Sequence, residues 1–251
     1  MKVIKGKDGS GQKNMTHGWI WMSSYWLCCI LVGYQREYLT FDAMFRIPEQ
    51  VSSSSVSSSS DNNNLVFWVI VATITTILAQ DVMGSRNDTF NRKRNLPAIL
   101  IFGIMNGILE TLLFIASYDY GRDMGGWMGL STASSAIVGF FTFFIYSFLI
   151  HALFWLPIAF PPHGRINAPP FHIHGLPALT ALGVAWIGLY ELTGGTLIII
   201  PCLLHVYVDI GCGLTMNLPG PFDKEKEDHQ QTHYHRVPHQ QQPDIGLRHH
   251  T

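Results

Sequence analysis

Three pairs of polar residues, each with a spacing of four, lie inside long apolar stretches of this sequence and could carry chemistry. Because four residues make about one turn of an α-helix, the two members of each pair lie on one helical face. Ionisable side chains are costly at membrane depth and by default mark a functional site there. We therefore expect three helices that each present one polar face to a shared interior. The pairs are Asn106 with Glu110, Ser147 with His151, and His205 with Asp209.

Glu110 is the strongest single candidate for a catalytic role. No basic residue lies within one helical turn of it, so an ionised carboxylate would need a partner from another helix. In such a setting it could act as a general base or general acid. His151 could share that work, bind a metal ion, or hydrogen-bond a neighbouring helix. The structural alternative for Glu110 is a neutral side chain bonded between helices.

His205 and Asp209 place an imidazole and a carboxylate on one helical face. This pair could orient a water molecule, donate to an oxyanion, or ligate a metal ion. A purely structural role as a polar link between helices is the alternative. Asn106 and Ser147 are expected to support the site through packing or hydrogen bonds rather than to react.

The composition is that of an integral membrane protein. Of the 251 residues, 47% are hydrophobic and only 13% are charged, and the mean hydropathy is +0.18. The apolar residues are concentrated in long runs between polar ends, which is typical of chains that cross a bilayer. The formal net charge is −1, without the concentrated basic stripe that binds phosphates, so we expect no nucleic acid partner.

The apolar runs predict an all-α fold, a polytopic bundle of about six transmembrane helices with disordered polar ends. Pro161-Pro162 ends the fourth run, because proline lacks the backbone donor that a helix interior needs. A break at residues 192–195 separates the fifth run from the sixth. The predicted spans cover residues 18–34, 65–80, 96–117, 134–160, 176–191 and 196–216.

Composition also divides the chain into three parts. Residues 1–64 hold a basic N-terminus, the first apolar run and a serine-rich loop expected to be disordered, and residues 65–217 form the helical core. Residues 218–251 form a His/Gln-rich tail expected to be disordered. We interpret residues 18–34 as a retained span, with a cleaved signal peptide or an organellar transit segment as the alternatives. Residues 118–128 are predicted to form a short, glycine-rich turn.

Short motifs around the polar pairs resemble those of the CPBP family, the CAAX-processing and bacteriocin-processing (ABI) intramembrane proteases. Residues 110–116 read ETLLFIA, which is similar to the first family motif, EELLFRG. Residues 147–151, SFLIH, resemble a second motif in which a histidine follows phenylalanine by four. Residues 205–209, HVYVD, match a last motif of the form His-x-x-x-Asn or similar. The resemblance covers about residues 96–215.

The resemblance implies an intramembrane endopeptidase that needs no metal or other cofactor. Glu110 and His151 would activate a water to attack a peptide carbonyl, and His205, helped by Asp209, would stabilise the oxyanion or polarise the same water. The substrate would be a membrane protein or a prenylated peptide. Three positions depart from the family pattern, where Glu, Arg and Phe are usual: Thr111, Ile115 and Ser147.

Two other functions fit the same residues. The order of Ser147 and His151, followed by His205 and Asp209, is similar to the sparse pattern of zinc-dependent membrane amide hydrolases of the ceramidase-like group, in which zinc would be the cofactor. A catalytically inactive scaffold or partner-binding protein would keep the polar faces only as links between helices. In each case we expect a multi-pass protein of an endomembrane or plastid, with the lipid bilayer as its partner.

Overall fold

A computed structural model describes two units of the chain, and each is described by itself. In the smaller unit (Met1–Asn14 and Lys224–Thr251), strand β1 (Lys13–Asn14) pairs antiparallel with strand β2 (Lys224–Glu225). The tail predicted to be disordered therefore contributes one short strand, and it lies outside the described residues beyond Glu225. The described residues are 13–14, 16–46, 59–84, 95–151, 175–215, 218, 220–222 and 224–225.

The larger unit, Met15–Asp223, contains every helix among the described residues, and it confirms the predicted all-α bundle. Asn95 and Ser131 begin two of the helices as N-caps, each accepting a hydrogen bond from a backbone N–H three residues ahead at 3.2 Å. The helices are α1 (Thr16–Gln35), α2 (Phe41–Phe45), α4 (Ser59–Gly84), α5 (Leu96–Trp127), α6 (Thr132–Leu149), α7 (Gly175–Leu192) and α8 (Ile199–Thr215).

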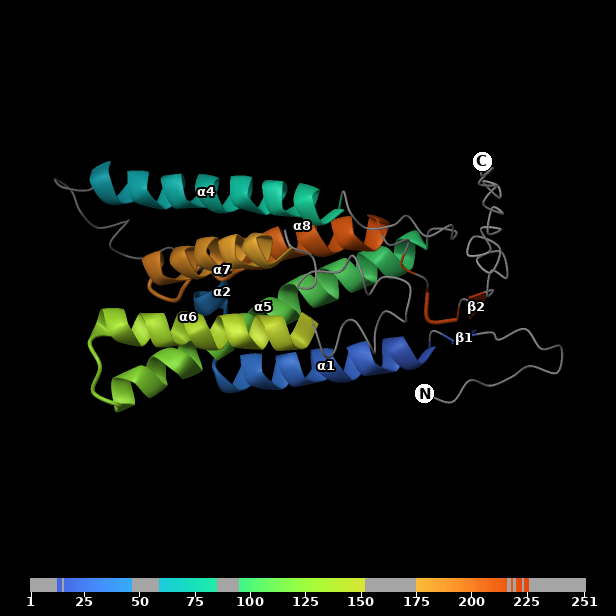
Figure 1. The fold of residues 1–251 in the computed structure, drawn as a ribbon, viewed down its shortest axis with the longest axis horizontal. Coiled ribbons are helices and arrows are strands. Elements are labelled where there is room, and N and C mark those ends of the chain that lie inside the picture. Colours follow the sequence, from blue (N-terminus) through green and yellow to red (C-terminus); the bar gives the residue numbers. More distant parts are fainter. Residues whose placement is uncertain are drawn as a thin grey trace, which may run out of the picture. The chain divides into compact units, whose positions relative to one another are not determined.

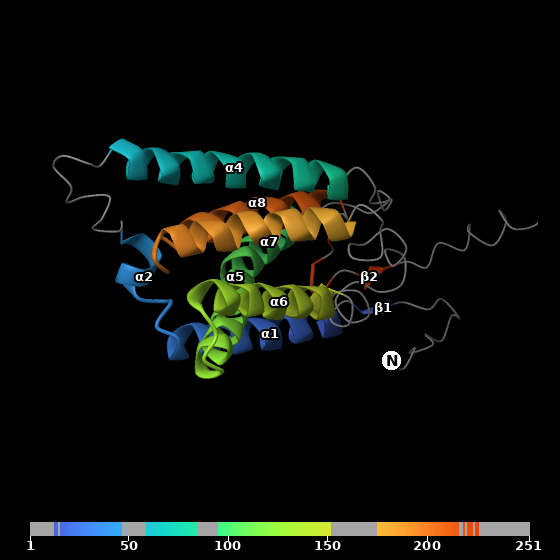
Figure 2. The same cartoon turned by 60° about the vertical axis from the view of Figure 1, so that its left-hand side comes forward.

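Helix α5 is the centre of the bundle. It packs against α1, α6 and α8, while α4 packs against α7 and α8. Figures 1 and 2 both show α5 between α8 on one side and α1 with α6 on the other. A residue on α5 can therefore reach three other helices.

Small residues let α5 and α8 approach closely. Gly103 and Gly107 lie four apart on one face of α5, in contact with Ile210 and Val206 of α8. A Cβ added at Gly107 would lie 2.5 Å from the Cα of Val206, which is too close for any side chain. Such small residues one turn apart are typical of close helix crossings in membranes. They hold α8 near the polar face of α5.

The prediction of a turn at residues 118–128 is wrong, because α5 continues without interruption to Trp127. Gly121 and Gly125 lie four apart and face α6, where an added Cβ would lie 2.8 Å from the Cα of Gly139 and of Ser135, respectively. These glycines therefore serve close packing of α5 on α6 rather than a change of chain direction. The packing compensates for the weak helix propensity of glycine.

The serine-rich loop predicted before the second apolar run also needs correction. Thr40 caps the short helix α2, and α4 begins at Ser59, well before the apolar run at Leu65. Polar residues are favoured at the start of helices, so α4 begins in the polar segment that precedes its apolar run. Residues 47–58 of this loop lie outside the described residues.

Two predicted boundaries farther along the chain have different outcomes. The break after Leu192 is confirmed, with Gly194 and Gly195 at positive φ between α7 and α8. The fourth span was predicted to reach residue 160, but the described part of it is α6 followed by one wider, π-type turn at Ile150 and His151. Residues 152–174 lie outside the described residues.

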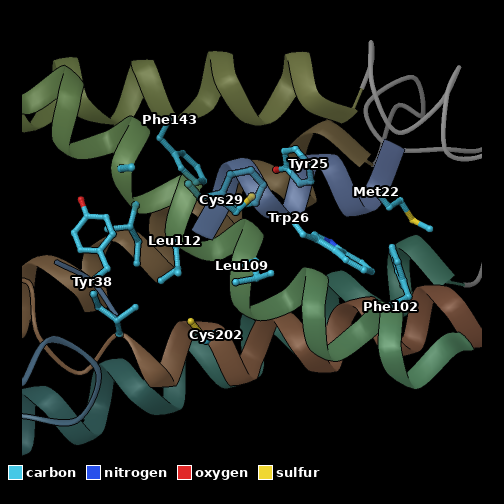
Figure 3. Close-up of a cluster of buried hydrophobic side chains, with 14 of the residues drawn as sticks. Met22, Tyr25, Trp26, Cys29, Tyr38, Phe102, Leu109, Leu112, Phe143 and Cys202 are labelled. Carbon is cyan, nitrogen blue, oxygen red and sulfur yellow. The ribbon is translucent and has the colours of Figure 1, made fainter. Parts of the chain in front are cut away.

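Helix α1 is a full part of the core. Met22, Tyr25, Trp26 and Cys29 are buried against α5, and Figure 3 shows them on one side of α1. The opposite side of α1 exposes apolar residues such as Leu31. A helix with one buried face and one exposed apolar face is suited to the rim of a bundle in lipid.

The outer surface of the helical unit is that of a membrane protein. Within the described residues, three helices are long and apolar enough to cross a membrane: Asn64–Asp81, Leu96–Trp127 and Thr132–Leu149. Large apolar side chains are exposed along them, including Phe67 on α4 and Phe141 on α6. Two shorter apolar helices, Pro177–Leu192 and Ile199–Thr215, accompany them. The total of six crossings stays a prediction.

Candidate functional site

Asn106 joins the two carboxylates of the site. Its Nδ2 group donates to Glu110 Oε2 at 2.7 Å and to Asp209 Oδ2 at 2.9 Å. Its Oδ1 atom accepts from Trp26 Nε1 at 3.1 Å. Because an indole N–H can only donate, the contact with Trp26 assigns the oxygen end of the amide to α1 and the nitrogen end to the carboxylates. The polar faces of α5 and α8 thus meet at one position.

His205 directs its two ring nitrogens to different partners. Thr111 Oγ1 donates to the Gly107 carbonyl at 2.6 Å and lies 3.0 Å from His205 Nδ1. Because the hydroxyl has a single hydrogen, Nδ1 carries the proton of that second contact and donates it. In the neutral imidazole, Nε2 then presents a lone pair, 3.6 Å from Glu110 Oε2 and 3.5 Å from Asp209 Oδ2. Three acceptor atoms face one another at the centre of the site.

The second oxygen of Glu110 is held by Tyr25, which in turn contacts Tyr146 on another helix. Tyr25 on α1 donates its hydroxyl to Glu110 Oε1 at 2.9 Å. Tyr146 on α6 lies 2.9 Å from the Tyr25 hydroxyl oxygen. The Tyr25 ring lies between α1 and α5 in Figure 3. Four helices therefore position one carboxylate.

His151 lies beside the cluster of Glu110, His205 and Asp209, on the face of an aromatic ring. Its Nδ1 donates to the Ser147 carbonyl at 2.7 Å, so both members of the third sequence pair bond to each other through the backbone of α6. The Phe114 ring stacks on His151 with centroids 6.3 Å apart and on His205 with centroids 5.6 Å apart. The Phe114 ring is therefore a neighbour of both imidazoles.

The centre of the site is dry. The exposed fractions are 1% for Glu110, 4% for His205 and 8% for Asp209. The Trp186 ring lies 5.0 Å from the His205 ring and, with Phe114, covers the imidazole with apolar surface. In such surroundings electrostatic interactions are stronger than in water.

Sequence reasoning missed five residues of the site. Thr111 was noted only as a departure from a motif, yet it bonds to His205. Phe114 is apolar and gave no polar signal, and the other three lie in aromatic runs where a hydrogen-bonding tyrosine or tryptophan is hard to tell from a packing residue. The signal that remained was the density of such residues in the first apolar run. The missed residues are Tyr25, Trp26, Thr111, Phe114 and Tyr146.

A second polar cluster lies at the other end of α5. Asp119 Oδ2 accepts from Tyr38 at 2.5 Å and from Tyr190 at 2.7 Å, and Arg122 lies 3.1 Å from Asp119 Oδ1. Arg122 also pairs with Glu191 at 2.6 Å. Burial raises the pKa of Tyr38, which follows α1 in the chain, and its hydrogen bond to Asp119 raises this pKa further. This cluster joins the α1–α2 turn, α5 and α7.

No family model, curated protein or solved structure matches the chain. The resemblance to CPBP proteases therefore stays a hypothesis supported by the motif residues.

The arrangement offers two kinds of chemistry. Glu110, His205 and Asp209 each present one ligand atom within 4.8 Å of the others, so together they could hold a metal ion. The same three atoms could hold a water molecule and take up one of its protons. Asn106 and Thr111 hold the side chains in place for either purpose.

Proposed function

We propose that this protein is a membrane-embedded hydrolase that cleaves a peptide bond, with a water molecule bound by Glu110, His205 and Asp209 as the nucleophile. The observation that carries the proposal is the convergence of three acceptor atoms from α5 and α8, with Glu110 Oε2 at 3.6 Å and Asp209 Oδ2 at 3.5 Å from His205 Nε2. Buried polar groups at membrane depth are retained where they serve a function.

The proposed chemistry begins with a water held between acceptors. It donates its hydrogens to two of them, which increases the nucleophilic character of its oxygen. As the oxygen bonds to the carbonyl carbon, the water proton passes to His205 Nε2 or to the Glu110 carboxylate. The same proton is then delivered to the departing nitrogen as the carbon–nitrogen bond breaks. General acid–base catalysis of this kind contributes about 10²–10⁴-fold to a rate.

Supporting contacts favour this use of the site. Asn106 and Tyr25 donate to the carboxylates, so Glu110 and Asp209 keep fixed positions when the proton moves. Donors and acceptors that are already oriented in a dry site act strongly on charge that develops during reaction. The Thr111 contact keeps His205 Nε2 as the free end of the imidazole.

His151 keeps a proposed role as a second base. Its Nδ1 hydrogen is used by the Ser147 carbonyl, which leaves Nε2 as the acceptor. Its ring stacks on Phe114 and belongs to the π-type turn that follows α6. Turns of this type occur often at functional sites.

The resemblance to CPBP proteases supplies the proposed substrate and setting. A membrane protein or a prenylated peptide would reach the site from the bilayer, and the chain would be a multi-pass protein of an endomembrane or plastid. The exposed apolar surfaces of α4 and α6 support residence in lipid.

A scaffold without catalysis is the second candidate. The observation in its favour is that Asn106 has a partner for its oxygen and for both hydrogens of its amide, so the network already links α1, α5 and α8. A network that serves only as a link between helices would function equally well with a neutral amide at Glu110.

A peptidase assay separates these candidates. Full-length protein in liposomes is given a fluorogenic transmembrane peptide library, and wild type is compared with Glu110→Gln and His205→Gln. The matched control is Asp123→Asn, because Asp123 is an exposed carboxylate of α5 that pairs with Arg36. We expect turnover to fall at least about 100-fold in both site variants and to be unchanged in the control. Equal turnover in all four proteins would reject the hydrolase.

A further inference from the structure

We propose that Glu110 Oε2, His205 Nε2 and Asp209 Oδ2 bind one divalent transition-metal ion of the zinc class, with a fourth position open for water. The inference rests on the geometry of these three atoms and not on hydrolysis, so it and the proposed function can fail separately.

The distances between the atoms favour a metal ion over a shared proton. A carboxylic acid that donates to an imidazole nitrogen approaches it to about 2.6–3.0 Å. His205 Nε2 lies 3.6 Å from Glu110 Oε2 and 3.5 Å from Asp209 Oδ2. Ligand bonds of about 2.0–2.1 Å to a tetrahedral zinc ion place neighbouring ligand atoms roughly 3.4 Å apart. The two distances from His205 Nε2 match the edge of such a tetrahedron, and the third pair of atoms lies within 4.8 Å.

The charges of the bundle also favour a cation. Two carboxylates lie beside an imidazole in a buried interior, where charged groups are usually paired or coordinate a metal ion. Among the described side chains there are three arginines, and each pairs with another carboxylate. These pairs are Arg36 with Asp123, Arg46 with Asp42, and Arg122 with Asp119 and Glu191. The described arginines thus serve other carboxylates, and a divalent ion bound by Glu110 and Asp209 would balance the charge of this pair.

The groups around the three atoms are those that support a metal site. A histidine that ligates through Nε2 usually donates its Nδ1 hydrogen to a protein oxygen, and His205 does so to Thr111. Asn106 donates to Glu110 Oε2 and Asp209 Oδ2, and each carboxylate oxygen keeps a second lone pair for a ligand bond. Both oxygens thus carry the hydrogen bonds that are usual for ligating carboxylates.

The donor set selects the class of metal. One imidazole with two carboxylates suits zinc, and also accepts manganese, iron or cobalt. An open fourth position is the pattern of catalytic rather than structural zinc sites. With an ion bound, Glu110, His205 and Asp209 would be ligands and could not also hold the water directly or take up its proton as proposed above. Turnover that survives a chelator would support the metal-free mechanism, and turnover that needs the ion would replace it.

The test measures metal in the purified full-length protein. The tail contains six histidines that could capture zinc, so the reference protein has all of them replaced by glutamine: His229, His233, His235, His239, His249 and His250. This protein is purified in detergent without a histidine tag, dialysed against dilute zinc and then against buffer, and analysed by mass spectrometry. Asp209→Asn and His205→Gln are compared with the exposed-carboxylate control Asp123→Asn.

We expect about one zinc ion per chain in the reference protein and in the Asp123→Asn control, and loss of the ion in both site variants. Cobalt in place of zinc should give visible absorption bands of a tetrahedral site that depend on His205. Less than a tenth of an ion per chain in the reference protein, under conditions where its helical content is intact, would overturn the inference.

Instability of the variants would not obscure the result, because the reference protein decides it alone. A second measurement uses only this protein: its melting temperature with zinc present and after treatment with a chelator. A site ligand should raise the melting temperature in proportion to the logarithm of zinc concentration. An unchanged melting temperature, together with absent metal, would reject the site even if hydrolysis were observed.

Discussion

Thr111 Oγ1 lies 3.0 Å from His205 Nδ1, and this one contact orients the imidazole between α5 and α8. The hydroxyl is itself held by the Gly107 carbonyl at 2.6 Å, so the backbone of α5 controls a ring on α8. His205 Nε2 faces the carboxylates as a result. Thr111 is therefore a positioning residue, at a place where the CPBP motif has a glutamate.

Thr111→Val should weaken the site while leaving the fold in place, since valine has the shape of threonine without the hydroxyl. Loss of such a support costs about 10–100-fold in metal affinity or activity. Thr111→Ser should restore most of the loss, because it returns the hydroxyl. Zinc content, zinc affinity and peptide turnover are the measurements. A valine variant that equals wild type in all of them would show that the contact does not orient His205.

Gly107→Ala should push α8 away from α5. An added Cβ would lie 2.5 Å from the Cα of Val206, and overpacking of this kind costs about 1–3 kcal/mol. We expect a lower melting temperature in detergent and loss of the contacts between Asn106 and Asp209.

The matched control is Gly126→Ala, because no atom lies within 4 Å of a Cβ added at that helical position. It should be neutral or stabilise the protein by up to about 1 kcal/mol through helix propensity. Equal melting temperatures of the two variants would refute the close contact between α5 and α8.

Tyr25→Phe should destabilise the bundle and disturb Glu110. The change removes the hydroxyl that donates to Glu110 Oε1, and loss of a hydrogen bond to a buried carboxylate costs about 1–3 kcal/mol. Tyr207→Phe is the control, since this tyrosine of α8 is about half exposed. Chemical unfolding of both variants gives the comparison. If Tyr25→Phe is no less stable than Tyr207→Phe, then α1 does not hold the carboxylate.

The Asp119 cluster should support stability in a pH-dependent way without affecting the Glu110 site. The pKa of Tyr38 is raised in the folded protein, so its contribution is complete below the unfolded value of about 10 and is lost as the pH rises above it. The melting temperature should fall above about pH 10, and Tyr38→Phe should reduce that fall. Zinc content should stay the same in this variant. An identical alkaline profile for both proteins would contradict a role for the Tyr38 hydrogen bond.

Local spacing was sufficient to identify the polar faces. Asn106 with Glu110, and His205 with Asp209, share a face in any α-helix, because one helical turn depends only on nearby residues. The helix that carries His205 and Asp209 was predicted within a few residues of its bounds, whereas the end of α5 was placed ten residues too early. Since apolar runs of this length favour a membrane, the all-α fold could be predicted from composition and periodicity.

The tertiary structure alone decided which faces meet and what surrounds them. Tyr25 reaches Glu110 from a distant part of the chain, and Phe114 places its ring against both His151 and His205. Gly121 continues α5 where its composition predicts a turn, because the approach of α6 compensates for its low propensity. Such contacts depend on how helices pack, and packing is set by the shapes of surfaces far apart in sequence. The sequence therefore determined the chemistry available on each helix, and the packing of small residues determined that three acceptor atoms face one another.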